Sequence, residues 1–305
     1  MSLTQLEAQL LAAGEAVEPA PIFILGSPRT GSTVLYEAMV AALGAPYISN
    51  LTNEHFAETP IIGMAISRAY ARAPAFESQY GKIAGPHAPS EGSLVVGRWC
   101  GGGNPSEITS PGVLTHMEAH MRATLSAAEA AWGAPVIIKN AWNCFRVAAL
   151  SAAFPRARFI WIRRDIAAAA HSDLAARYKT KGDPNAWNSA TPRNIDDLKR
   201  LPHWAQVVEN QAEFARAISA SLERLDPSRQ ATIWYEDFTA APVKVLGALI
   251  AHLSIAGSVA PLPADKIAAP SKAPPLPADD AQRLTAYVES QGARLAAHAY
   301  RPDAR

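Results

Sequence analysis

The residues best suited to chemistry follow a short apolar run near the start of the chain. Residues 26–33 read GSPRTGST and come directly after PIFIL at 21–25. Glycines at both ends of such a turn, between an expected strand and an expected helix, are typical of a loop that binds phosphate through backbone N–H groups. We therefore expect an anion site at the N-terminus of a helix that begins near Ser32.

This loop differs from that of a nucleoside triphosphatase. Such enzymes read G-x-x-x-x-G-K-[ST], but here Ser32 occupies the lysine position. The positive charge has moved to Arg29, whose forked guanidinium can reach an oxyanion and a bridging oxygen together. The loop indicates an anion other than a magnesium-bound triphosphate.

A second anion site is indicated further along the chain. Arg164 ends the apolar run that begins at residue 158, and Ser172 follows eight residues later, about two turns into an expected helix capped by Asp165. An arginine at a strand end beside a hydroxyl suits a ribose 3'-phosphate, a group that ATP lacks. Arg163 is one residue out of register and is more typical of a surface charge.

These segments resemble the sulfotransferase family. PRTGST resembles the 5'-phosphosulfate loop, in the Pro-Arg-x-Gly-[ST]-Thr form of bacterial members and tyrosylprotein sulfotransferases. FIWIRRDIAAAAHS resembles the 3'-phosphate motif of the same family. Lys139-Asn140, the following FPRARF and the YEDF segment that begins at Tyr235 resemble three further family segments, so that the likeness spans residues 22–253. Asn140-Ala141 departs from the usual [ST]-Pro.

The resemblance implies a metal-independent enzyme. It would transfer a sulfonate from 3'-phosphoadenosine 5'-phosphosulfate (PAPS) to a hydroxyl or amine of a small-molecule or peptide acceptor, and release 3'-phosphoadenosine 5'-phosphate (PAP). A sulfonate on a phosphate carries less negative charge than a triphosphate, so hydrogen-bond donors aimed at the leaving phosphate suffice without a divalent ion. The residues assigned to donor binding are Pro28, Arg29, Thr30, Gly31, Ser32, Thr33, Arg164, Ser172, Tyr235 and Lys272.

Catalysis also requires a base for the acceptor proton, which typically contributes about 10²- to 10⁴-fold. Glu54 follows the first expected helix at about the distance at which tyrosylprotein sulfotransferases place a catalytic glutamate. His55 is the second candidate. Arg29 would bind the reacting group, and Lys139 would stabilise the sulfuryl oxygens in the transition state.

The expected elements fit this chemistry. Short apolar runs at 21–25, 136–139, 158–162 and 231–235 alternate with helical patterns, including one at 3–13 and one at 32–43. Such alternation favours an α/β fold in which a parallel sheet of buried strands has helices on both faces. We expect one domain over residues 1–305, with irregular segments at 81–112 and 257–280 as surface connections or lids.

Composition limits the other possibilities. A net charge of +1 argues against nucleic-acid binding. Cys100 and Cys144 lack motif spacing, and no apolar run reaches the roughly 20 residues of a membrane helix, so we expect a cytoplasmic protein. His116 and His120 lack a third metal ligand and indicate a surface or packing pair. Two alternatives remain: a phosphotransferase or nucleoside triphosphatase, and a non-catalytic nucleotide-binding protein. The oligomeric state is open.

Overall fold

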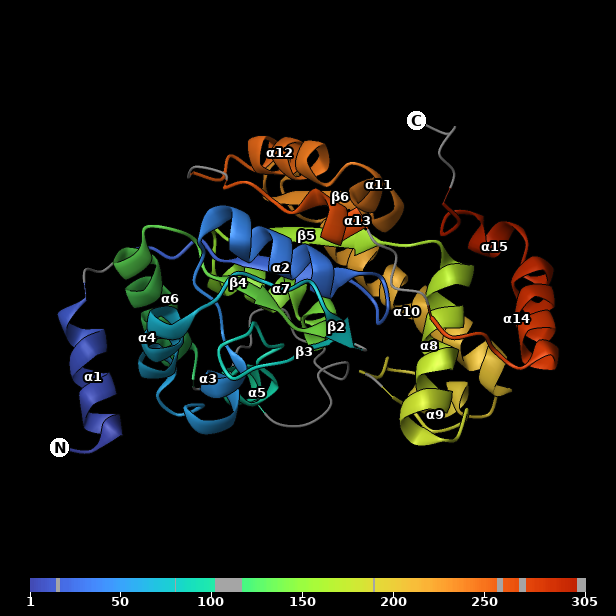
Figure 1. Cartoon of the computed structure of the whole chain (residues 1–305), viewed down its shortest axis with the longest axis horizontal. Helices are drawn as coiled ribbons and strands as arrows, with labels where there is room; N and C mark the ends of the chain where they lie inside the picture. Colours follow the sequence, from blue (N-terminus) through green and yellow to red (C-terminus); the bar gives the residue numbers. More distant parts are fainter. Residues whose placement is uncertain are drawn as a thin grey trace.

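A parallel sheet forms the centre of the computed structural model, which describes residues 1–14, 17–79, 81–101, 117–188, 190–256, 260–268 and 273–300 (Figure 1). Its strand order is β4-β1-β5-β6, and all three pairings are parallel. The expected α/β fold with a parallel sheet is confirmed. The strands are β1 (Ile22–Leu25), β4 (Ile137–Lys139), β5 (Arg158–Arg163) and β6 (Gln230–Trp234).

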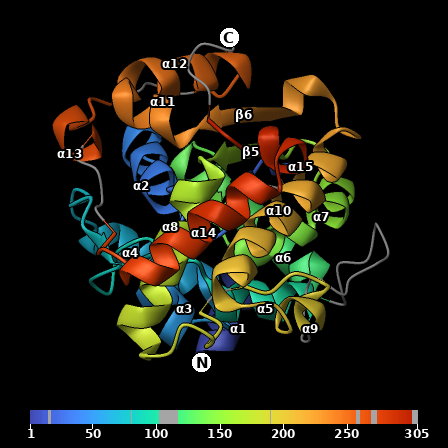
Figure 2. The same cartoon turned by 90° about the vertical axis from the view of Figure 1, so that its right-hand side faces the viewer.

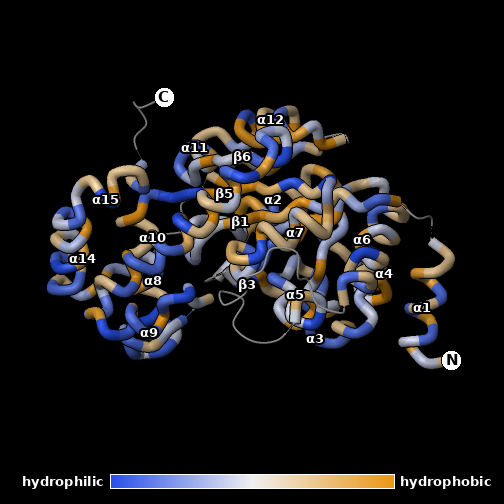
Figure 3. The backbone as a smooth tube through the Cα atoms, turned by 180° about the vertical axis from the view of Figure 1, so that it is seen from behind, coloured by the Kyte–Doolittle hydropathy of each residue, from blue (hydrophilic) through white to orange (hydrophobic). Residues whose placement is uncertain are grey.

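Alternate residues of the central strands pack on opposite faces of the sheet. Phe23 and Phe159 join a cluster with side chains of α6 (Glu118–Trp132), α7 (Val147–Ala153) and α10 (His203–Leu222). Ile24 and Ile160 join another with α2 (Ser32–Leu43) and α12 (Pro242–His252). Helices therefore cover both faces of the sheet, and apolar residues lie along the strands β1 and β5 between them (Figure 3).

The fourth expected strand differs from the other three in burial. All four residues of β1 are buried, whereas none of the five residues of β6 is fully buried. β6 forms one edge of the sheet. β4 forms the other edge but is buried, with Tyr47 paired to Ile137 on its outer side, so edge position alone does not set burial, and the apolar run at 231–235 does not reveal the difference.

Most of the remaining helices lie at the two ends of the sheet (Figures 1 and 2). The expected N-terminal helix is α1 (Leu3–Ala13). It packs beside α4 (Pro60–Tyr70) and α6, whereas α8 (Ile166–Lys181) packs with α10 and α14 (Ala278–Ser290). The bounds of the others are α3 (Asn50–His55), α9 (Ile195–Leu198), α11 (Tyr235–Ala240) and α15 (Ala293–Ala296).

The two irregular segments contain regular structure over their described residues. Within 81–101, β3 (Lys82–Ile83) pairs with β2 (Ser78–Gln79), and α5 (Ser93–Cys100) follows. In the second segment, α13 (Ala264–Ala268) is formed and α14 begins before residue 280. Residues 102–112, 257–259 and 269–272 lie outside the described ranges. Among the residues that the structure describes, no helix combines the length and apolar character needed to cross a bilayer.

Candidate functional site

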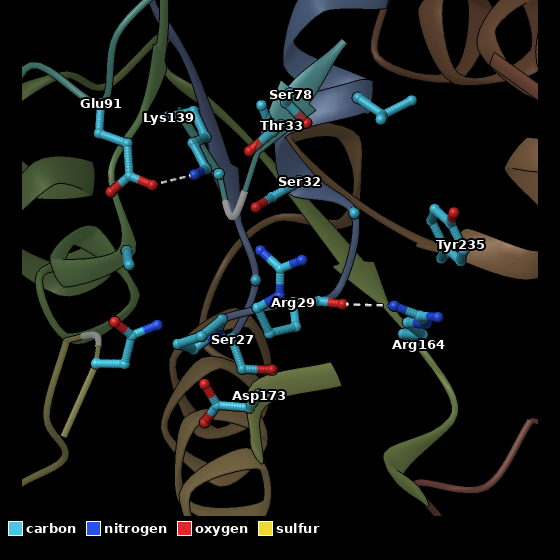
Figure 4. A pocket seen from close by; sticks show the side chains of 17 residues that line it. Ser27, Arg29, Ser32, Thr33, Ser78, Glu91, Lys139, Arg164, Asp173 and Tyr235 are labelled. Atoms are coloured by element: carbon cyan, nitrogen blue, oxygen red, sulfur yellow. Dashed lines mark hydrogen bonds and ion pairs between the residues drawn. The ribbon is translucent and has the colours of Figure 1, made fainter. Parts of the chain in front are cut away.

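A pocket opens at the carboxyl edge of the sheet, where β1 and β4 end and α2 begins (Figure 4). Ile24 pairs with Lys139 on one side and with Ile160 on the other, so the loops that follow these strands meet at one edge. The lining residues are Gly26, Ser27, Pro28, Arg29, Gly31, Ser32, Thr33, Val34, Ser78, Gly81, Glu91, Lys139, Ala141, Arg164, Asp173, Asn188 and Tyr235.

The loop after β1 presents the N-terminus of α2 to this pocket. Gly31 is the N-cap in the left-handed region, with φ 86°, and no side chain among the described residues caps the helix. Arg29 also has a positive φ, 71°, which is unfavourable for a residue with a side chain and is often found at functional sites. The open helix N-terminus attracts an anion.

Arg29, Arg164 and Ser172 come together in one place. Arg29 Nε donates to Ser172 Oγ at 3.1 Å, and an Nη of Arg164 donates to the backbone oxygen of Arg29 at 3.0 Å. Both arginines line the same pocket (Figure 4). The residues of the two anion sites expected from the sequence therefore lie together in one part of the structure.

Tyr235 lies between the loop and Arg164. The guanidinium carbon of Arg164 stands 4.8 Å from the centre of the Tyr235 ring. On the loop side, a Cβ placed on Gly31 would lie only 2.2 Å from Tyr235 Cδ2. Close approach of the ring, as well as positive φ, therefore requires glycine at position 31.

The Gly31→Ala variant is expected to lose most of its affinity for PAP, because the new methyl group must displace Tyr235 or the loop. Gly44→Ala is the matched control: Gly44 ends the same helix with φ 56°, but a Cβ there meets no atom within 4 Å. Both variants carry the cost of a side chain at positive φ, roughly 1 kcal/mol. Titration calorimetry with PAP distinguishes them, and equal losses would show that the Tyr235 contact is irrelevant.

Lys139 ends β4 inside the pocket, where its Nζ donates to Glu91 Oε1. The Lys139 side chain is only 7% exposed and that of Glu91 is 37% exposed. Asn140 Nδ2 donates to the backbone oxygen of Glu91 at 3.0 Å, which ties the Glu91 loop to the end of β4. No sequence pattern indicated Glu91, because it stands in an irregular segment far from the motifs.

Asp173 is a second carboxylate that the motifs did not reveal. It follows Ser172 on α8, is almost fully buried and lines the pocket. Burial raises the pKa of the Asp173 carboxyl, while the guanidinium groups of Arg177 and Arg29 lower it. Asp173 therefore contributes to the charge environment in which Arg29 is held.

The candidate bases from the sequence lie elsewhere. Glu54 and His55 are exposed at the end of α3 and do not line the pocket. The spacing after the first helix suggested them, but α3 turns both side chains to the surface. Thr30 and Ser172 also lie outside the lining; the hydroxyl of Thr30 donates to the backbone oxygen of Ser27 at 2.8 Å, within the loop.

Two of the remaining predictions fall on residues that the structure does not describe, Lys272 and His116. His120 accepts a hydrogen bond from Trp99 Nε1 at 3.1 Å, which agrees with a packing role. Over the described ranges, no three His, Cys, Asp or Glu side chains gather as a metal site would require.

The fold and the site define a class of protein. The model of the sulfotransferase family matches residues 21–258, which is most of the chain, and the chain belongs to this family. The match includes the loop after β1, Lys139, Arg164 and Tyr235.

Individual sulfotransferases are similar to this chain at low sequence identity. The omega-hydroxy-beta-dihydromenaquinone-9 sulfotransferases Stf3 of Mycobacterium bovis and Mycobacterium tuberculosis are each 26% identical over 261 residues. These regions cover 77% of this chain and 63% of the relatives, so the chain spans less than two thirds of their length.

Solved structures show the same fold. Sulfotransferase STF1 of Mycobacterium tuberculosis H37Rv matches with a TM-score of 0.54 and 16% identity, over 97% of this chain and 81% of that one. Sulfotransferase STF9 of Mycobacterium avium matches with a TM-score of 0.52 and 14% identity, over 94% and 71%.

Proposed function

We propose that the protein transfers a sulfonate from PAPS to a hydroxyl group of a small-molecule or peptide acceptor without a metal ion. The main support is that Arg29, Arg164 and Lys139 line one pocket at the open N-terminus of α2. Three cations and a set of backbone N–H groups suit a ligand with phosphate at two positions and a sulfonate. Three cationic side chains suit a ligand that carries a dianionic 3'-phosphate better than one whose ribose is neutral.

Each residue would have a distinct part in this reaction. The N–H groups at the start of α2 and Arg29 would bind the 5'-phosphate and stabilise the charge that develops on it as the sulfonate leaves. Arg164 would bind the 3'-phosphate, and Ser172 would hold the Arg29 guanidinium in place through the hydrogen bond to its Nε. Lys139 would bind the sulfuryl oxygens.

A nucleoside triphosphatase is the alternative with the same general fold. It is disfavoured because Ser32 occupies the position of the loop lysine. The acceptor hydroxyl is supported by the family and by the mycobacterial relatives, which are named as sulfotransferases of an omega-hydroxy compound. We further propose a cytoplasmic location, since Cys100 and Cys144 are both free and buried.

A thermal shift assay without magnesium tests the proposal. PAP is expected to raise the melting temperature more than AMP or ATP at equal concentration, because only PAP carries a 3'-phosphate in addition to the 5'-phosphate. A ligand at 100 times its Kd stabilises the folded state by about 2.7 kcal/mol. A larger shift with ATP and magnesium would instead support the triphosphatase. PAP binding without sulfonate transfer to any acceptor would support a non-catalytic nucleotide-binding protein.

A further inference from the structure

A buried lysine and a partly exposed glutamate face each other inside the pocket. Lys139 Nζ and Glu91 Oε1 form an ion pair (Figure 4). Lys139 comes from the end of β4, next to the strand that leads into the anion-binding loop. Glu91 comes from the loop between β3 and α5, 48 residues away in sequence. The pair places a proton acceptor beside the cation expected to bind the sulfonate.

Glu91 is held at its backbone by Asn140 and at its carboxylate by Lys139. Asn140 Nδ2 donates to the Glu91 backbone oxygen, and Asn140 Oδ1 accepts the N–H of Trp142 at 3.0 Å, so the amide is held at both ends. Glu91 Oε1 and Thr33 Oγ1 both lie next to Gly81, because a Cβ there would be 3.7 Å from each of them. The Glu91 carboxylate is therefore close to the first turn of α2.

This anchoring explains a departure in the sequence. Asn140 stands where the family pattern has serine or threonine followed by proline. A side-chain amide can donate to one backbone group and accept from another, as Asn140 does here. The substitution thus coincides with a loop contact that brings a carboxylate to Lys139.

We propose that Glu91 is the catalytic base, and that Lys139 holds it in an ion pair until the donor is bound. This inference rests on the proposed sulfonate transfer. The donor's sulfonate competes for Lys139 and releases Glu91. The acceptor oxygen then forms a bond to sulfur as the bond from sulfur to the 5'-phosphate oxygen breaks. The acceptor proton passes to Glu91, and the electron pair of the broken bond stays on the phosphate of PAP.

The other carboxylates fit this role less well. Glu54 does not line the pocket. Asp173 lines the pocket, but it is only 1% exposed, and the positive charges of Arg177 and Arg29 lower the pKa of its carboxyl group. A base must contact the acceptor hydroxyl directly or through one water. Of the three, Glu91 alone combines a place in the pocket with an exposed carboxylate.

Glu91→Gln tests the proposal, with Glu54→Gln as the rival variant. Glu58→Gln is the matched control, since Glu58 is exposed and pairs with Arg98 outside the pocket. PAP formation from PAPS is measured with water, aliphatic alcohols and 4-nitrophenol as acceptors. Glu91→Gln is expected to lower the rate by about 10²- to 10⁴-fold with alcohols. The loss is smaller with 4-nitrophenol, which ionises without help, and Glu58→Gln keeps the wild-type rate.

Binding supplies an independent readout. Glu91→Gln removes both the competitor for Lys139 and a negative charge beside the sulfonate, so the affinity for PAPS is expected to rise relative to that for PAP. An unchanged ratio of the two affinities overturns the proposal. So does a wild-type rate in Glu91→Gln with every acceptor, or a loss confined to Glu54→Gln. If wild-type protein binds neither PAP nor PAPS, the proposed function itself fails, which is a different result.

Discussion

Replacing Lys139 by methionine is expected to lower the rate of sulfonate transfer by about 10²- to 10³-fold, which is the loss seen when one donor to a developing oxyanion is removed. The expected cause is the charge that collects on the sulfuryl oxygens as the bond to phosphate breaks. Lys139 is buried at the end of β4, where water cannot easily replace it. The measurement is PAP release from PAPS in single turnovers with enzyme in excess.

The same variant is expected to bind PAP nearly as well as the wild type, because PAP has no sulfonate. Methionine fills a similar volume and leaves Glu91 unpaired but partly exposed to solvent, so the fold is preserved. Lys179→Met, at an exposed position on α8, is the control for loss of a lysine charge. A fall in PAP affinity as large as the fall in rate would mean that Lys139 binds the nucleotide rather than the transition state.

Arg164→Ala is expected to weaken PAP binding by about 10- to 100-fold, since a hydrogen bond to a charged group contributes about 1.5 to 3 kcal/mol. AMP, which lacks the 3'-phosphate, should lose much less affinity. The comparison matters because Arg164 also donates to the backbone oxygen of Arg29 and stacks on Tyr235. Calorimetric titration of both nucleotides separates recognition of the 3'-phosphate from support of the loop.

Arg156→Ala is the matched control for this experiment. Arg156 precedes β5, whereas Arg164 follows it, so the same charge is removed at the opposite end of one strand. Arg156 is exposed, and its guanidinium donates to the backbone oxygen of Glu18 at 3.5 Å. If PAP and AMP lose affinity equally in Arg164→Ala, Arg164 positions the loop and the 3'-phosphate is bound elsewhere.

Local patterns in the sequence sufficed for the sheet and for most of the anion site. The expected helix after the loop, 32–43, has the bounds of α2, and the four apolar runs correspond to the four strands of the parallel sheet. The reason is physical: a strand, a glycine turn and a helix N-terminus are specified by neighbouring residues. Parallel strands also bring their carboxyl ends to one edge, so Arg29, Lys139 and Arg164 had to lie near one another.

The tertiary structure alone decided where the carboxylates stand. Glu54 was suggested by its distance from the first helix, but the orientation of α3 leaves it exposed, and the contact of Asn140 with the Glu91 loop has no periodic signal. Packing likewise turned β6 into an edge strand and joined Arg29 to Ser172 across 143 residues. Motif spacing determines which groups follow each strand, whereas long-range packing of irregular segments determines which groups face one another.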